Sequence, residues 1–260
     1  VFSIKGVTKM SGHSKWHTIR FKKAATDAKR GKLFTKIIKE IIVAARMGGS
    51  DMESNARLRT AVRAARDSNM PRDNIERAVK RGAGELPGVH YEDFVYEAYG
   101  PGGVAIMIEG TTDNKNRTTP EIRHMLSKGG GNLGESGCVS WMFTKKGIIT
   151  VNAEGVNEDK LTEDVIDAGA DDIANMGESF SVTTEPNDVD KVRAALEAKS
   201  YKILGSEVIL TPQNTVAVDE KHGLTLMKLL NNLEEHDDVS RVSANYDISD
   251  EIMERIQEQL

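Results

Sequence analysis

The chain has 260 residues, which is long enough for two or more domains. Its formal net charge is −5, and its 38% hydrophobic and 29% charged residues are typical of a globular protein. No apolar run approaches the roughly 18 residues that a membrane span needs, so we expect no membrane partner.

The cysteine content and the start of the chain bear on the compartment. The single cysteine, Cys138, excludes an intrachain disulfide and a cysteine-rich zinc cluster, as is typical of a reducing environment. The first nine residues precede a possible initiator, Met10, and are too short and too weakly apolar for a secretory signal. We therefore expect a cytoplasmic protein, and we leave these nine residues out of the fold prediction.

Positive charge is concentrated in the first third of the chain. Residues 1–82 contain 20 Lys and Arg against 7 Asp and Glu, a balance of +13. The remaining residues contain 15 against 33, a balance of −18. Such asymmetry indicates a segment that binds a polyanion, and nucleic acid is the first candidate partner.

The basic segment predicts a helical domain over residues 11–82. Apolar residues at steps of three and four indicate helices over residues 33–45 and 58–65, and a third helix from Pro71 to Gly82. Residues 12–30 are rich in cations and poor in apolar residues, so we expect a mobile or loosely packed arm there. The three amphipathic helices predict a small bundle.

Beyond a linker at residues 83–89, strands and short helices mix without a strict βαβ order, which favours an α+β fold. Alternating residues predict a hairpin with a Gly- and Pro-rich turn at 99–103, and strands at 139–143 and 148–151. The pattern over residues 145–212 is β-α-β-α-β and predicts a ferredoxin-like α+β domain. The last helix and strand then return to the first sheet. We expect the ferredoxin-like domain to be inserted into a discontinuous α+β domain of residues 88–144 and 213–248.

The arm and the first helix contain the main candidates for nucleic-acid contact. Cations neutralise phosphates and release counterions, and aromatic rings among them stack on unpaired bases. The alternatives are a solvated helix face for the cations and a packing role for the aromatic rings. The predicted contact residues are Lys15, Trp16, Arg20, Lys22, Lys23, Lys29, Arg30, Lys32 and Lys36.

A second candidate patch consists of Asp113, Asn114, Asn116 and Arg117, at the end of a predicted strand and the start of a helix. The free amides of a helix N-terminus and the Arg117 side chain favour an anion. Asn is also a common helix cap, so capping and turn formation alone are the simpler interpretation.

Four other patterns suggest chemistry only weakly. The glycines at 129–134 formally match a dinucleotide fingerprint, but they follow a helix and precede a strand, which predicts a flexible turn instead. His13 and His17 have metal-ligand spacing without a third ligand. Cys138 has no obvious base, since His124 lies 14 residues earlier. The acidic residues at 171–172 and 234–238 are of the type that holds magnesium in a nuclease, yet they resemble solvated helix ends. We expect no enzymatic activity, metal or cofactor.

Several blocks in order resemble the YebC family, from Met10 to the C-terminus. They are GHSKW at 12–16, AA at 24–25, DAKRGK at 27–32, FTK at 34–36, NMP at 69–71, YGPGG at 99–103, DN at 113–114 with NRT at 116–118, and GGNLG at 130–134. The resemblance implies an N-terminal helical bundle followed by two α+β domains, the last inserted into the middle one, with no catalytic residues and no cofactor. The family includes probable bacterial transcriptional regulators and the mitochondrial translational activator of cytochrome c oxidase subunit I.

Two functions compete on this basis. The first is a non-enzymatic, DNA-binding transcriptional regulator whose basic domain holds the nucleic-acid backbone while the acidic domains engage protein. The alternative is a translation factor that acts at the ribosome through ribosomal RNA. The positive charge of the basic domain does not distinguish duplex DNA from folded RNA. No zinc-finger, helix-turn-helix or RRM signature supplies base recognition.

Overall fold

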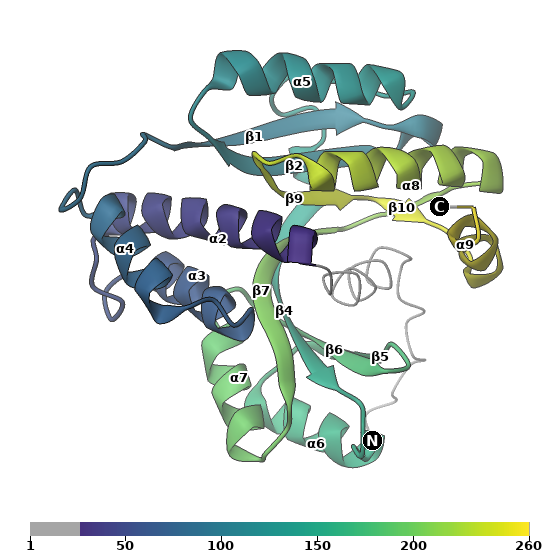
Figure 1. Cartoon of the computed structure of the whole chain (residues 1–260). Coiled ribbons are helices and arrows are strands. Elements are labelled where there is room, and N and C mark those ends of the chain that lie inside the picture. The colour runs from purple at the N-terminus through teal and green to yellow at the C-terminus, as the bar shows by residue number, and fades with distance from the viewer. Residues whose placement is uncertain (1–26, 260) are drawn as a thin grey trace.

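The computed structural model describes residues 27–259 and shows an α+β fold with three parts, a helical bundle and two antiparallel sheets (Figure 1). None of the helices in this described stretch is both long enough and apolar enough to cross a membrane. The α+β class agrees with the prediction from the sequence.

The bundle consists of α2 (Asp27–Gly48), α3 (Ala56–Asp67) and α4 (Arg72–Gly82). Its core is formed by the predicted apolar stripes, including Ile41, Leu58 and Ile75. The side chain of Asn55 caps α3 by accepting from Leu58 N, and its amide donates to the carbonyl of Ala44 in α2. The three predicted helices are confirmed. Helix α2 begins earlier than expected, because residues 27–30, predicted as part of the arm, form its first turn; the rest of the arm lies outside the described residues.

The first sheet has the strand order β3-β1-β2-β9, with all neighbours antiparallel. Helices α5 and α8 pack their apolar stripes on the same sheet core, together with the short C-terminal helix α9, which the sequence analysis did not predict. The return of the last helix and strand to this sheet is confirmed, since β9 pairs with β2. The elements are β1 (Glu92–Tyr99), β2 (Ala105–Thr112), α5 (Lys115–Lys128), β3 (Asn132–Leu133), α8 (Glu220–Glu235), β9 (Val239–Ala244) and α9 (Asp250–Gln257).

The second sheet has the order β5-β6-β4-β7, and its chain order β-α-β-β-α-β is that of a ferredoxin-like fold. We call residues 143–212 the inserted unit. Helices α6 and α7 cover the sheet and share its apolar core. The elements are β4 (Phe143–Asn152), α6 (Glu158–Ala168), β5 (Asp172–Asn175), β6 (Ser179–Thr184), α7 (Val189–Ala198) and β7 (Ile203–Pro212).

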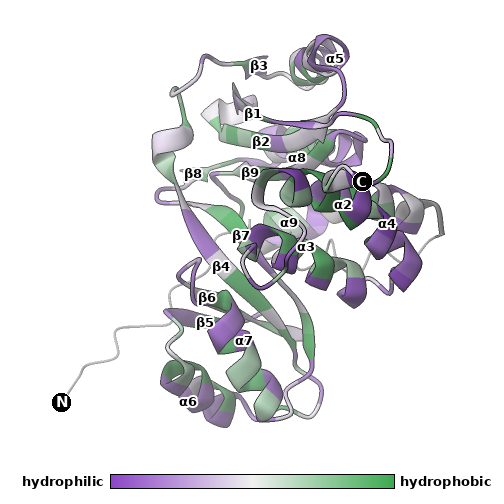
Figure 2. Ribbon diagram, turned by 90° about the vertical axis from the view of Figure 1, so that its left-hand side faces the viewer, coloured by the Kyte–Doolittle hydropathy of each residue, from purple (hydrophilic) through white to green (hydrophobic). Residues whose placement is uncertain are grey.

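Strands β4 and β7 carry the chain into and out of the inserted unit, and they pair with each other from Phe143 opposite Pro212 to Val151 opposite Ile203. Figure 2 shows them joining the inserted unit at the bottom to the rest of the molecule. The sequence predicted two strands here, at 139–143 and 148–151. This was wrong: β4 is one continuous strand preceded by a 3-10 turn (Ser140–Met142), because pairing with β7 carries the strand through its exposed polar centre.

Candidate nucleic-acid interface

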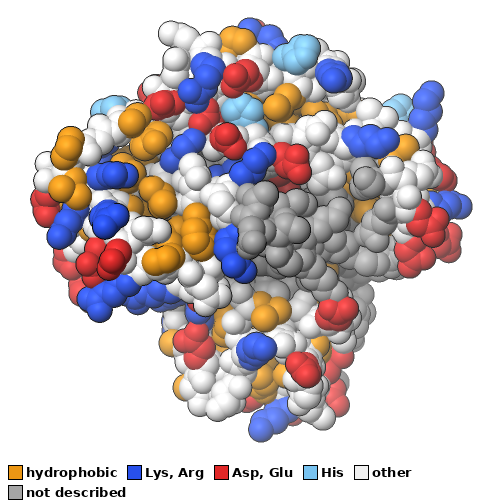
Figure 3. Space-filling model, viewed as in Figure 1, with side chains coloured by type: hydrophobic (Ala, Val, Ile, Leu, Met, Phe, Trp, Pro, Cys, Tyr) orange, Lys and Arg blue, Asp and Glu red, His pale blue; other side chains and the backbone are white. Residues whose placement is uncertain are grey.

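The free side of the bundle carries a group of cations that we call the outer cationic face. Helix α4 turns Ile75 and Ala78 inward, and Gly82 approaches α2 so closely that a Cβ there would lie 2.5 Å from the carbonyl oxygen of Ile42. The cations are left outside on α4 and at the end of α3. Figure 3 shows Lys and Arg side chains gathered over this end of the molecule. The outer cationic face consists of Arg66, Arg77, Lys80 and Arg81, all exposed.

These four cations differ from the arginines of the bundle that bind carboxylates. Within residues 27–259, none of the four forms an ion pair with an acidic side chain, whereas Arg57 binds Glu40 and Asp93. Like charges at this density repel one another unless an anion lies among them. The outer cationic face is therefore suited to a polyanion.

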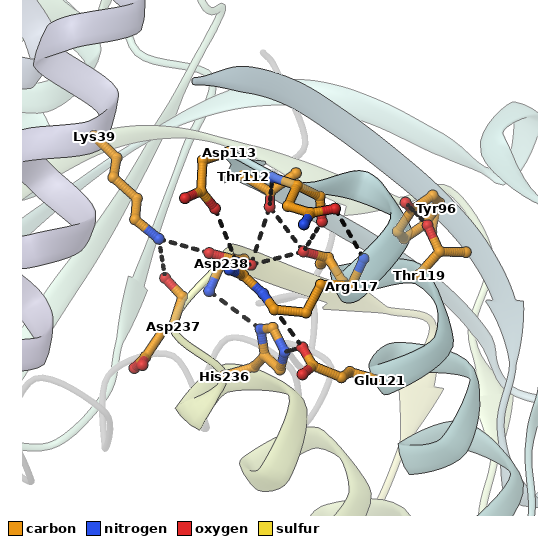
Figure 4. A network of polar contacts seen from close by, with 12 residues as sticks. Lys39, Tyr96, Thr112, Asp113, Arg117, Thr119, Glu121, His236, Asp237 and Asp238 are labelled. Atoms are coloured by element: carbon orange, nitrogen blue, oxygen red, sulfur yellow. Dashed lines mark hydrogen bonds and ion pairs between the residues drawn. The ribbon is translucent and has the colours of Figure 1, made fainter. Parts of the chain in front are cut away.

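The second feature is a buried carboxylate where the bundle meets the first sheet. Asp238 follows α8 and is only 3% exposed. Lys39 of α2 donates to its Oδ1 at 2.6 Å, and Arg117 of α5 donates to its Oδ2 at 2.5 Å. Figure 4 shows Lys39 and Arg117 approaching Asp238 from two separate helices. One carboxylate thus connects α2, α5 and the turn between α8 and β9.

Hydroxyl groups complete this polar network. Thr112 and Thr118 both donate to Oδ2 of Asp238, at 3.1 and 2.7 Å. Burial alone would raise the pKa of Asp238, but the hydrogen bonds from Lys39, Thr118 and Arg117 outweigh it and hold the pKa well below its ordinary value. Asp238 consequently remains a carboxylate at neutral pH.

Lysines of α2 also bind the carboxyl end of α8. The ammonium groups of Lys32, Lys36 and Lys39 donate to the carbonyl oxygens of Glu235, Glu234 and Asp237, at 3.3, 2.5 and 3.0 Å. These are carbonyls at or just beyond the end of the helix, where orphan acceptors and the helix dipole favour cations. The lysine face of α2 therefore lies against α8.

A groove of about 720 Å³ opens beside the network. Its lining contains acidic and basic side chains of α2, α5 and the end of α8, among them Lys32, Asp113, Glu121 and Asp237. Because both signs of charge are present and the cations already have acidic or carbonyl partners, the groove has no surplus positive charge for a phosphate. It differs in this respect from the outer cationic face.

The structure places the predicted contact residues of the N-terminal segment as follows. Lys29 and Arg30 lie in the first turn of α2, where Arg30 is exposed. Lys32 and Lys36 are the α8-binding lysines described above. Contact of any of the nine residues with nucleic acid stays a prediction. Those that lie outside the described residues are Lys15, Trp16, Arg20, Lys22 and Lys23.

In the second predicted patch, the capping interpretation accounts for most of the contacts. Asn114 caps α5 by accepting from the backbone N–H of Arg117. The Arg117 guanidinium binds Asp113 at 3.0 Å as well as Asp238, and these carboxylates neutralise its charge. Asn116 is exposed and takes no part in the contacts just described. Its side chain is therefore the one in this patch that is open to a ligand.

The centre of the network is not apparent in the sequence. The prediction of a solvated helix end at residues 234–238 is wrong for Asp238, because Lys39 and Arg117 bury its side chain between them. No local pattern signals this burial, since Lys39 lies 199 residues away. A buried lysine on the polar face of a predicted helix is likewise visible only in the folded chain.

The structure bears on two other features of the sequence. The glycine-rich segment at 129–134 forms the predicted turn only at residues 129–130; residues 132–133 form β3, which pairs with β1, and a Cβ on Gly131 would lie 2.4 Å from the carbonyl oxygen of Tyr99. Burial raises the pKa of the Cys138 thiol, with the nearby Glu97 carboxylate adding to the effect, so this thiol is a poor nucleophile.

The fold and the site define a class of α+β proteins in which a basic three-helix bundle is tied by ion pairs to two antiparallel sheets. The family model of the TACO1/YebC protein N-terminal domain matches residues 14–85, and that of the TACO1/YebC second and third domain matches residues 91–246. The chain belongs to the TACO1/YebC family.

Close relatives share nearly the full length of the chain. A "probable transcriptional regulatory protein" of Syntrophobacter fumaroxidans is 55% identical over 95% of this chain and 100% of its own length, and one of Syntrophus aciditrophicus is 54% identical over 95% and 99%. The crystal structure of a conserved hypothetical protein of Aquifex aeolicus is similar to this one with a TM-score of 0.81, at 50% identity, over 87% of this chain and 94% of that one. The two bacterial relatives from Syntrophobacter and Syntrophus are thus named as probable regulators of transcription.

Proposed function

We propose that the protein is a non-enzymatic, cytoplasmic regulator that binds nucleic acid through the phosphate backbone. The observation that supports this best is the outer cationic face, four exposed cations without acidic partners among the described residues. The outer cationic face lies within residues 1–82, whose charge balance is +13. Each phosphate contact releases condensed counterions, which makes such binding favourable and dependent on salt.

The packing of the bundle favours contact with the backbone over insertion of a recognition helix. Lys32, Lys36 and Lys39 of α2 donate to carbonyl oxygens at the end of α8, and Arg57, Arg59 and Arg63 of α3 bind carboxylates of other elements. The outer cationic face lies at the end of α3 and on α4 and has no acidic partner among the described residues, whereas Arg72 of α4 binds Glu76. Phosphate contacts set the position of a protein on nucleic acid but carry no sequence information directly.

The names of the relatives support DNA as the first target. The acidic part of the chain, with a balance of −18 after residue 82, repels phosphates and is suited to contact with protein. We therefore assign nucleic acid to the bundle and protein partners to the two sheet-containing parts. This division follows the three domains expected at 11–82, at 88–144 with 213–248, and at 145–212.

Translation at the ribosome is the second candidate function. It is favoured by the occupied faces of α2 and α3, because folded RNA is recognised largely by its shape and backbone and does not require a helix in a groove. In this case the same cationic face contacts ribosomal RNA. The two candidates share the surface and differ in the target.

The binding experiment compares two variants with equal loss of charge. In the test variant the outer cationic face is replaced by Ala at all four positions. In the control, four exposed lysines outside the bundle are replaced, namely Lys128, Lys160, Lys202 and Lys228. We expect only the test variant to lose affinity for 20-base-pair DNA or RNA, and its salt slope to fall by about 0.9 per lost phosphate contact on DNA. Equal behaviour of the two variants contradicts the assignment.

The target is identified separately in cell lysate. Sedimentation with ribosomes at moderate salt that survives DNase supports the translation function. Absence from ribosomes, together with enrichment of defined promoters after crosslinking, supports transcription. Failure of the purified full chain to bind either DNA or RNA at near-physiological salt contradicts both.

A further inference from the structure

The bundle and the inserted unit meet through ion pairs between α3 and α7. Arg59 Nε lies 3.2 Å from Oδ2 of Asp190, and Arg63 binds the other oxygen of the same carboxylate. In the opposite direction, Arg193 of α7 donates twice to Asp67, at 2.9 and 3.1 Å. Figure 1 shows α3 lying against the inserted unit on the side that carries α7.

Two of the four arginines of α3, Arg59 and Arg63, form a matched pair around one anion. Arg59 and Arg63 are four residues apart and share one face of the helix. Arg66, three residues further on, belongs to the outer cationic face. The pair is therefore continuous with the surface to which we assign nucleic acid. Guanidinium groups bind phosphate with the same donor geometry with which they bind carboxylate.

We propose that Arg59 and Arg63 are a second phosphate-binding site, in which the Asp190 carboxylate takes the place of a nucleic-acid phosphate until nucleic acid displaces it. This inference rests on the proposed function and adds a regulated site to it. Binding of the backbone at α3 then requires the inserted unit to move away from the bundle. The inserted unit thereby limits the affinity of the free protein.

The contacts at the interface are compatible with such a separation. The side chains of Arg59, Arg63 and Asp190 are 34%, 28% and 38% exposed, and ion pairs with this much access to water contribute little to stability and are screened by salt. The Arg193–Asp67 pair is less accessible, at 10% and 27% exposed, and α3 also packs against β7, so these contacts are the larger cost of separation.

Each side also keeps partners of its own after separation. Arg193 retains Glu197 and Ser206, both within the inserted unit. Arg59 retains the carbonyl oxygens of Met52 and Glu53, which hold its guanidinium in place before α3. Helix α3 loses the carboxylate of Asp190, which a phosphate replaces, and Asp67 loses its two hydrogen bonds from Arg193 and turns to water.

The test uses the full chain with Asp190→Asn and, as a matched control, Asp167→Asn. Asp167 is exposed on α6, away from α3, and the two changes alter net charge equally. Affinity for a 20-base-pair RNA and a DNA of the same sequence is measured by fluorescence anisotropy at fixed salt. We expect Asp190→Asn to bind about 3- to 10-fold more tightly than the control, the range expected for release of two partly exposed ion pairs.

A second comparison identifies the arginines as the site. Arg63→Gln is introduced into the wild-type chain and into the Asp190→Asn chain. In the wild type Arg63 is bound to Asp190. We therefore expect Arg63→Gln to reduce the affinity for nucleic acid more in the Asp190→Asn chain than in the wild-type chain. Asp67→Asn weakens the other ion pair of the interface, that with Arg193, and should likewise increase the affinity for nucleic acid. It replaces Asp190→Asn if that variant fails to fold.

The outcomes separate the two proposals. If the wild type binds nucleic acid and Asp190→Asn matches Asp167→Asn, net charge explains the result and the second site is wrong. The same conclusion follows if Arg63→Gln has equal effects in both backgrounds. If the wild type does not bind, the proposed function itself fails.

Discussion

The ammonium group of Lys39 lies 2.6 Å from a carboxylate oxygen of Asp238, although the two residues are 199 positions apart in the sequence. Their side chains are 11% and 3% exposed, so the pair is shielded from water. Arg117 binds the other oxygen of the same carboxylate. One buried acidic side chain and its donors therefore help to hold the bundle against the first sheet, together with the Arg57–Asp93 ion pair and the lysines that bind the end of α8.

Replacement of Asp238 by Asn should destabilise the protein by about 3 kcal/mol, because removal of one partner leaves a buried charge on Lys39 without compensation. Urea denaturation of the two proteins measures the difference. The control is Asp237→Asn, since that neighbouring side chain is exposed, and it should change the free energy of unfolding by less than about 0.5 kcal/mol. A stable Asp238→Asn variant would show that the network is not structural.

The same carboxylate predicts a dependence of stability on pH. The pKa of Asp238 is lower in the folded chain than the ordinary value near 3.9, so its stabilising contribution is complete above that value and is lost as the pH falls toward the folded pKa. The stability difference between the wild type and Asp238→Asn should therefore be constant near neutral pH. It should shrink below about pH 4. A constant difference down to the lowest pH at which both proteins fold would contradict this.

Glu97 offers a third test, because its buried carboxylate accepts from the backbone N–H groups of Gly137, Val139 and Ser140 at 2.7, 2.7 and 2.8 Å. Burial alone would raise the pKa of Glu97, but the hydrogen bonds from these three N–H groups outweigh it, so the pKa is lowered. Glu97→Gln should cost about 1 to 3 kcal/mol, since the amide cannot accept all three bonds. Amide hydrogen exchange of the three donors should accelerate, while Glu135→Gln, an exposed change nearby, leaves it unaltered.

Two glycine substitutions should act in opposite directions. A Cβ on Gly110 would lie 2.1 Å from the carbonyl oxygen of Asp238 and 2.4 Å from the Phe94 ring, so Gly110→Ala should destabilise by at least about 2 kcal/mol. Gly31 lies in α2 with no atom within 4 Å of its Cβ position. Gly31→Ala should stabilise by about 0.5 to 1 kcal/mol, because Ala favours the helix. Thermal unfolding checks both; equal signs would contradict the prediction.

The cationic arm carries a binding prediction. Replacement of Lys22, Lys23, Lys29 and Arg30 by Ala should weaken nucleic-acid binding and reduce the salt slope by up to about 0.9 per lost phosphate contact on duplex DNA. The melting temperature should be nearly unchanged if these residues serve binding alone. A large fall in the melting temperature would assign them a structural role instead.

Local patterns predicted the elements whose stabilising contacts are local. The three bundle helices followed from apolar residues three and four apart, and the cap at Asn114 followed from its position at the start of α5. Strand β5 was not predicted, because Asp172–Asn175 is a half-exposed edge strand without clear alternation, and pairing with β6 makes it a strand. The continuous strand β4 was missed because its polar residues 144–146 are held in the strand by pairing with β7.

The amino-acid sequence alone indicates the opposite charges of the two portions of the chain, the helical bundle and, apart from the edge strand β5, the order of elements in the inserted unit. Only the tertiary structure decided which cations are neutralised: Lys39 by Asp238, Arg59 and Arg63 by Asp190, and none of the outer cationic face by any described acid. The difference lies in how far apart along the sequence the interacting residues are. Helix formation depends on residues within one or two turns, whereas the partner of a charged side chain is set by the packing of segments more than a hundred residues apart.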